Sequence, residues 1–243
     1  MKYYIQENQE NFYNLLSINA KKHDECFTFV HYIDDKKVKV QLTRSDLLKK
    51  SIDVAAKLKT EGIKKGDRVI ILSTQTVDNV LSVVGSMFAG AIFTIIPPPI
   101  DLSKMERFIS VVKSCNPKCL LCGNMLENKS KEILSTLKKK AEVAEIFSNL
   151  DVINVENCEE AVDFTPEKID LDDIIYIQYS SGSTSAPKGV LISYGNLISA
   201  VNTTVEPLGA ERVFGWVPFF HNLGLVYLIF TSIIKPEFVV GIM

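Results

Sequence analysis

The sequence predicts an α/β fold in which mostly parallel sheets carry helices on both faces. Three observations support this prediction. Residues 68–72 form a nearly continuous apolar run, which is typical of a parallel strand buried on both faces. Amphipathic stretches alternate with runs of this kind, as crossover connections require. The composition, with 47% hydrophobic and 23% charged residues and a net charge of −2 over 243 residues, is that of an ordinary globular chain.

The N-terminal quarter predicts two helices around a hairpin. Apolar residues at helical spacing indicate a helix within residues 1–20. Alternating apolar residues indicate strands at 26–33 and 38–42, with a polar turn between them. A further helix is expected to begin at Thr43, whose hydroxyl can cap it, and to end at Gly62.

The middle of the chain predicts three buried strands, each followed by a helix. The expected strands are 68–72, 91–96 and 118–122, and the expected helices are 78–89, 101–114 and 130–140. Residues 149–173 are rich in acidic side chains and contain Pro166, so they are interpreted as a surface segment.

The last part of the chain continues the same alternation. Strands are expected at 174–177 and 190–192, a helix at 193–201, a short strand at 214–218, and the start of a further element at 219–225. We expect residues 1–170 to form a first α/β subdomain and residues 171–243 to begin a second. The apolar run 239–243 differs from the polar ends usual for domains, so more sequence is expected after it.

The overall totals argue against several functional classes. A net charge of −2 offers no basic surface for nucleic acid. The uncharged stretches 80–96 and 213–234 are interpreted as buried, because the first is short and the second contains Pro218 and His221, so no membrane span is expected. Five cysteines and no signal peptide predict a cytoplasmic protein. The cluster 115–122 has three cysteines but no nearby histidine, and no metal site is predicted there.

Residues 178–190, with the sequence QYSSGSTSAPKGV, are the most informative stretch. The seven residues 180–186 are all small, five of them carry hydroxyls, and Lys188 follows with Gly189 behind it. Backbone N–H groups, hydroxyls and one ammonium can converge on the oxygens of a phosphate. A flexible serine-rich loop has a similar composition, but it needs neither the stiff Pro187 nor a lysine at its end. The stretch is therefore predicted to bind an anion.

The segment YSSGSTSAPKGV resembles the phosphate-binding signature of the adenylate-forming superfamily, which includes acyl-CoA synthetases, luciferases and nonribosomal peptide adenylation domains. Residues 42–47, 66–69 and 88–92 are similar to other parts of its N-terminal domain. Gln178 and residues 216–225 are most similar to fatty acyl-AMP ligases. Those enzymes activate a fatty acid with ATP, release pyrophosphate and pass the acyl adenylate to an acyl carrier protein.

The resemblance implies roles for particular residues. His221 is assigned to positioning the adenylate and carboxylate, and Lys188 to the reaction itself. The phosphates of ATP, with Mg²⁺ between them, are assigned to Ser180, Ser181, Gly182, Ser183, Thr184, Lys188 and Gly189. The family's adenine and ribose motifs and its C-terminal catalytic lysine have no counterpart before Met243, so residues 1–243 are expected to be the incomplete N-terminal part of the enzyme, inactive alone.

Two alternatives remain open from the sequence. The chain is also compatible with an acyl-CoA ligase or an amino-acid adenylation domain. A catalytically silent binding or scaffold relative is the other alternative, because Ser185 stands where the family usually has glycine and Asn222 where acyl-AMP ligases usually have aspartate.

Overall fold

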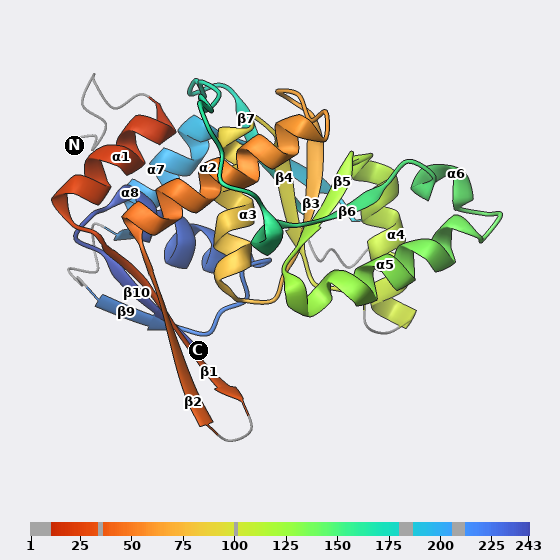
Figure 1. The fold of residues 1–243 in the computed structure, drawn as a ribbon, viewed down its shortest axis with the longest axis horizontal. Helices are drawn as coiled ribbons and strands as arrows, with labels where there is room; N and C mark the ends of the chain where they lie inside the picture. Colours follow the sequence, from red (N-terminus) through yellow and green to blue (C-terminus); the bar gives the residue numbers. More distant parts are fainter. Residues whose placement is uncertain (1–10, 34–35, 100–101, 180–186, 206–211) are drawn as a thin grey trace.

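The computed structural model describes residues 11–33, 36–99, 102–179, 187–205 and 212–243 (Figure 1). Its strands are β1 (Glu25–Ile33), β2 (Lys36–Thr43), β3 (Arg68–Leu72), β4 (Ile92–Ile96), β5 (Cys119–Cys122), β6 (Asp151–Asn154), β7 (Ile174–Tyr179), β8 (Gly189–Ser193), β9 (Arg212–Gly215) and β10 (Val239–Ile242). Its α-helices are α1 (Phe12–Lys22), α2 (Arg44–Thr60), α3 (Val77–Phe88), α4 (Leu102–Cys115), α5 (Asn124–Lys138), α6 (Ala144–Phe147), α7 (Tyr194–Val205) and α8 (Thr231–Ile234). A 3-10 turn, η1 (Val155–Asn157), and a π-helix, η2 (Gly224–Phe230), complete the described elements.

One sheet has six strands in the order β6-β5-β3-β4-β7-β8, and its neighbours are parallel except β7 and β8. Side chains of β3 alternate between two hydrophobic cores. Val69 and Ile71 pack into the core that contains α2 and α3, whereas Ile70 and Leu72 pack into the core that contains α4 and α5. Helices therefore cover both faces of this sheet, which confirms the α/β fold class predicted from the sequence.

The other sheet has four strands in the order β2-β1-β10-β9. Strands β1 and β2 form an antiparallel hairpin, while β10 is parallel to both β1 and β9. The hairpin projects from the body of the molecule (Figure 1). Both sheets take strands from either side of residue 170, and the subdomain boundary expected there stays a prediction.

Several elements differ from the sequence prediction. Helix α5 begins at Asn124 rather than at residue 130, and its polar first turn includes Glu127. The expected surface segment 149–173 contains β6, which pairs with β5 and lies at the edge of the sheet formed by the described strands. Asp151 at its start is exposed, so β6 lacks the continuous apolar run of a central strand. After residue 223 the backbone forms a π-helix, for which the sequence carries no recognisable signal.

The two uncharged stretches fold into short buried elements. Residues 80–96 divide between α3 and β4, and residues 213–234 divide among β9, η2 and α8. Within the described ranges, every helix is too short or too polar to cross a bilayer.

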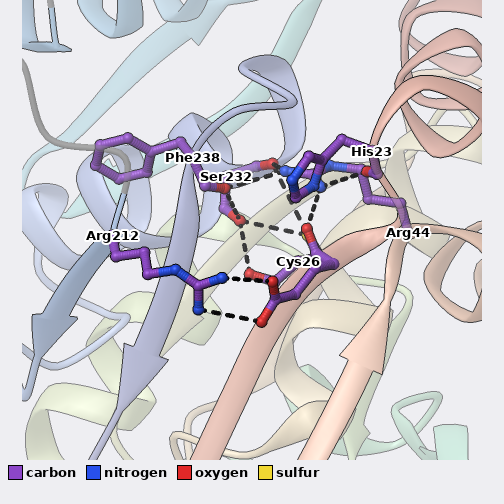
Figure 2. A network of polar contacts seen from close by, with 7 residues as sticks. His23, Cys26, Arg44, Arg212, Ser232 and Phe238 are labelled. Atoms are coloured by element: carbon purple, nitrogen blue, oxygen red, sulfur yellow. Dashed lines mark hydrogen bonds and ion pairs between the residues drawn. The ribbon is translucent and has the colours of Figure 1, made fainter.

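A buried arginine joins the N-terminal hairpin to the segment before β10 (Figure 2). Arg44 is fully buried and donates to five backbone carbonyl groups. Its acceptors are the oxygens of His23 at 2.6 Å, Glu25, Ser232 at 2.6 Å, Lys235 at 3.3 Å and Phe238 at 3.0 Å. Since three of these acceptors lie about 190 residues away, Arg44 fixes the path of 232–238 against the start of β1.

Candidate functional site

The hairpin of β7 and β8 supports the predicted phosphate loop. Tyr179 pairs with Gly189 in the last described register position of this antiparallel ladder. The ladder therefore fixes the two points at which the loop leaves and rejoins the sheet. Five predicted phosphate-binding residues, and Ser185 with them, lie outside the described residues: Ser180, Ser181, Gly182, Ser183 and Thr184.

Gly189 and Lys188 form the described end of the loop. A Cβ atom at Gly189 would lie 2.6 Å from Cγ2 of Ile177 and 3.2 Å from the ring of Tyr179. Glycine is thus required for the close approach of β8 to β7. Lys188 is exposed and forms no ion pair within the described part of the chain. An unpaired ammonium beside a run of hydroxyl residues is a donor set that fits a polyphosphate.

His221 lies in a tight turn that leads into the π-helix η2. Its backbone N–H donates to the Pro218 oxygen at 2.9 Å, and its carbonyl accepts from the N–H of Leu225 at 3.0 Å. Nδ1 of the imidazole accepts from the Leu223 N–H at 3.2 Å. Because Nδ1 is the acceptor, the proton of the neutral ring lies on Nε2. The exposed imidazole can therefore donate from Nε2 to an oxyanion.

The turn at 218–224 depends on Gly224. A Cβ atom there would overlap the carbonyl groups of Val217 and Pro218, so no larger residue fits without moving the backbone. The side chain of Phe219 is fully buried in the main core. The turn is thus anchored on both sides of His221, by core packing before it and by close backbone contact after it.

Two side chains of β7 join the loop hairpin to the His221 turn. Gln178 donates from Nε2 to the Phe220 carbonyl at 3.1 Å, and the Tyr176 hydroxyl donates to Oδ1 of Asn222 at 3.2 Å. Positions 176 and 178 lie on one face of the strand because side chains alternate. The structure therefore brings the β7 end of the predicted loop together with the segment that carries His221.

Two contacts at this site were missed by the sequence prediction. Tyr176 was expected only as part of a buried strand, yet burial raises its pKa to about 12 and keeps the hydroxyl protonated as a donor. Gln75, in the connection between β3 and α3, accepts from the N–H of Phe219 at 2.9 Å. The polar residues that follow β3 are the sequence signal that could have identified Gln75, because ligand-binding sites often lie at the carboxyl ends of parallel strands.

The described residues contain no group of three or more acidic, histidine or cysteine side chains suited to a metal. The thiols of Cys115, Cys119 and Cys122 are buried, and burial raises their pKa values to about 11, 12 and 11. These cysteines are free thiols that pack among apolar side chains in the described part of the chain.

Comparison with known proteins identifies one family and a consistent set of relatives. A family model described as AMP-binding enzyme matches residues 18–236. The long-chain-fatty-acid–AMP ligase FadD32 of Mycolicibacterium smegmatis is 31% identical over 189 residues, which cover 75% of this chain and 28% of that protein. A putative fatty-acid–CoA ligase, fadD21 of Mycobacterium leprae, is 30% identical over 217 residues, which cover 84% of this chain and 36% of that protein.

Solved structures that resemble this chain include enzymes of the same kind. The fatty acid AMP ligase from Legionella pneumophila superposes with a TM-score of 0.82 at 25% identity, covering all of this chain and 41% of that one. A fatty acyl-adenylate ligase from L. pneumophila, in complex with acyl adenylate and pyrophosphate, gives a TM-score of 0.81 at 25% identity and the same coverage. The chain spans well under half the length of each of these relatives.

Proposed function

The chain belongs to the AMP-binding enzyme family, and from this premise we propose that the complete protein activates a fatty acid with ATP. The products are a fatty acyl-AMP and pyrophosphate. The observation that carries the proposal is the junction of β7 with the His221 turn through Gln178 and Tyr176. A phosphate loop at the end of β7 and an imidazole donor on the turn would then face one reacting centre.

The proposed reaction is a displacement at phosphorus. A carboxylate oxygen of the fatty acid forms a bond to the α-phosphorus of ATP. The bond from this phosphorus to the bridging oxygen breaks, and that oxygen leaves with its electron pair on pyrophosphate. Two anions have to approach each other, so fixed donors and cations supply most of the stabilisation.

Lys188 and His221 each have a part in the proposed reaction. The Lys188 ammonium neutralises charge on the leaving phosphates, together with the N–H and hydroxyl groups of the loop 180–186. The Nε2–H of His221 donates to the carboxylate or to the acyl phosphate oxygen and so orients the nucleophile. Mg²⁺ bound to the phosphates would further neutralise their charge, and phosphate oxygens with water would supply most of its ligands.

The names of the relatives support the class of substrate, and the acyl acceptor is part of the proposal. FadD32 and the L. pneumophila enzymes are named as ligases of fatty acids to AMP, which supports a fatty acid substrate. We propose transfer to an acyl carrier protein, in the cytoplasm. A second candidate is transfer to coenzyme A, because fadD21 is named as a putative fatty-acid–CoA ligase.

Pyrophosphate release by the complete protein tests the proposal. We expect ATP-dependent release with medium- or long-chain fatty acids, and acyl transfer to a carrier protein but not to coenzyme A. Equal transfer to both acceptors would support the second candidate. No release with any fatty acid or amino acid would leave the silent binding module, which Ser185 and Asn222 suggest, as the better explanation.

A further inference from the structure

A third side chain holds the His221 turn, and it comes from a distant part of the chain. Gln75 lies in the connection between β3 and α3, 144 residues before Phe219. Its Oε1 accepts from the backbone N–H of Phe219 at 2.9 Å. Phe219 lies two residues before His221, whose own N–H is bonded to Pro218. Gln75 therefore contacts the backbone at the point where the turn begins.

The backbone of Gln75 is in an unfavourable conformation. Its φ angle is +58°, in the left-handed region that favours glycine and asparagine and that a glutamine rarely adopts. Glycine has no side chain, and asparagine is one methylene shorter. Neither would carry an acceptor as far as the Phe219 N–H from this backbone position. The need for reach explains why a glutamine occupies a strained position.

Asn79 holds Gln75 in this conformation. The Asn79 side chain is fully buried, and its Oδ1 accepts from the N–H groups of Thr74 at 2.6 Å and Gln75 at 2.8 Å. Its Nδ2 donates to the Leu72 carbonyl at the end of β3 at 3.0 Å. These bonds tie the connection between β3 and α3 to the first turn of α3 and to the end of β3. The strained residue is thus fixed to a rigid part of the six-stranded sheet.

We infer that Gln75 is a positioning residue that sets the place of His221 in the adenylating site. This inference rests on the proposed function. The Gln75 carboxamide acts on the imidazole through the backbone. It fixes the N–H of Phe219, and the hydrogen bond from the His221 N–H to the Pro218 carbonyl then fixes the backbone of His221 relative to Phe219. Gln178 and Tyr176 hold the other side of the same turn from β7. Displacement of about 1 Å at a reacting group can cost about 100-fold in rate.

Three variants of the complete protein distinguish the effect of side-chain length at position 75 from the effect of its backbone conformation. Q75N suits the positive φ angle but is too short to reach Phe219, so the fold should keep its stability while the contact is lost. Q75E keeps an acceptor at the original reach. Q41N makes the same chemical change as Q75N at an exposed position on β2, away from the site.

Kinetics provide the first readout. We expect Q75N to lower kcat/KM for the fatty acid about 10- to 100-fold without a fall in melting temperature. Q75E should recover most of this loss, and Q41N should match the wild type. In an H221A background, Q75N should cause little further loss, because its effect passes through the imidazole. Wild-type kinetics for Q75N together with impaired H221A would overturn the inference.

Amide hydrogen exchange provides a second readout that does not depend on activity. The Phe219 N–H is the donor to Gln75, so Q75N should raise exchange in a peptide spanning the turn, and Q75E should not. Unchanged exchange in Q75N would overturn the inference even if the protein adenylates no acid. An absence of adenylation by the wild type, with exchange altered as expected, would reject the proposed function and leave the positioning contact standing.

Discussion

The side-chain nitrogen of Gln178 donates to the backbone oxygen of Phe220 at 3.1 Å, across 42 residues of sequence. This bond joins β7, the strand before the predicted phosphate loop, to the residue directly before His221. The other end of the carboxamide, Oε1, is buried without a hydrogen-bond partner among the described residues. One amide group therefore links the two sides of the proposed site, and among the described residues its nitrogen alone has a partner.

Replacing Gln178 by methionine tests this junction. Methionine has a similar length but cannot donate, so the Phe220 carbonyl loses its partner. We expect a loss of about 1–3 kcal/mol in unfolding free energy and about a tenfold fall in kcat/KM. Urea unfolding and pyrophosphate release measure the two effects. Y176F removes the other bond of this junction, from the Tyr176 hydroxyl to Asn222, while it keeps the ring stacked on Phe93 at 5.4 Å. A fully active, fully stable Q178M would contradict the junction.

Removal of the imidazole should impair adenylation without unfolding the protein. His221 is exposed, so H221A removes little buried surface. Loss of one oriented donor to a reacting oxyanion typically costs about 100- to 1000-fold. We expect a fall of that order in kcat/KM for the fatty acid, measured by pyrophosphate release, and little change in melting temperature. H23A, at another exposed histidine, serves as the control. Equal activity of the two variants would exclude His221 from the reaction.

Lys188 should affect the use of ATP more than the use of the fatty acid. A hydrogen bond to a charged group contributes about 1.5–3 kcal/mol, so K188A is expected to lower kcat/KM for ATP about 10- to 100-fold. Steady-state kinetics with each substrate varied in turn measure this difference. K64A removes a similarly exposed lysine away from the loop and should have no effect. Retention of full ATP use by K188A would remove this lysine from the mechanism.

The sequence predicted those strands that a local pattern of apolar residues determines. The strand at 68–72 and the hairpin strands around the loop were predicted because their apolar runs are short and uninterrupted, and the structure confirms them as β3, β7 and β8. Edge strand β6 was missed because an edge strand needs no such run.

The contacts that build the site could not be predicted in the same way. The bonds from Gln75 and Gln178 join residues 144 and 42 positions apart, and only the folded topology brings them together. Glutamine rarely adopts a positive φ angle, so the conformational preference of this residue would have argued against the backbone conformation observed at Gln75.

Arg44 is expected to be important for stability. Methionine at this position would fill part of the space but donate to none of the five backbone carbonyls that Arg44 contacts. The carbonyls of Lys235 and Phe238 would keep a second donor, and the other three would lose the Arg44 bond. Each buried acceptor left unpaired costs about 1–3 kcal/mol, and partial relaxation reduces the sum, so we expect R44M to lose about 3–5 kcal/mol. Urea unfolding of the complete protein measures this loss. R212M is the control, because Arg212 is exposed and its pair with Glu25 contributes about 1 kcal/mol or less. Similar losses in the two variants would contradict the role of Arg44.

Stability should fall in alkaline solution because buried acids resist ionisation. Burial raises the pKa of Cys26 from 9.0 to about 11, of Cys119 from 9.0 to about 12 and of Tyr176 from 10.0 to about 12. Above pH 9 the unfolded chain releases protons that the folded chain keeps, so unfolding becomes more favourable as pH rises. The contribution is complete below about pH 9 and is lost progressively toward pH 11–12. Urea midpoints at a series of pH values measure the slope. C119A lacks one of these groups, so its stability should fall less steeply above pH 9, and an unchanged slope would show that Cys119 does not contribute.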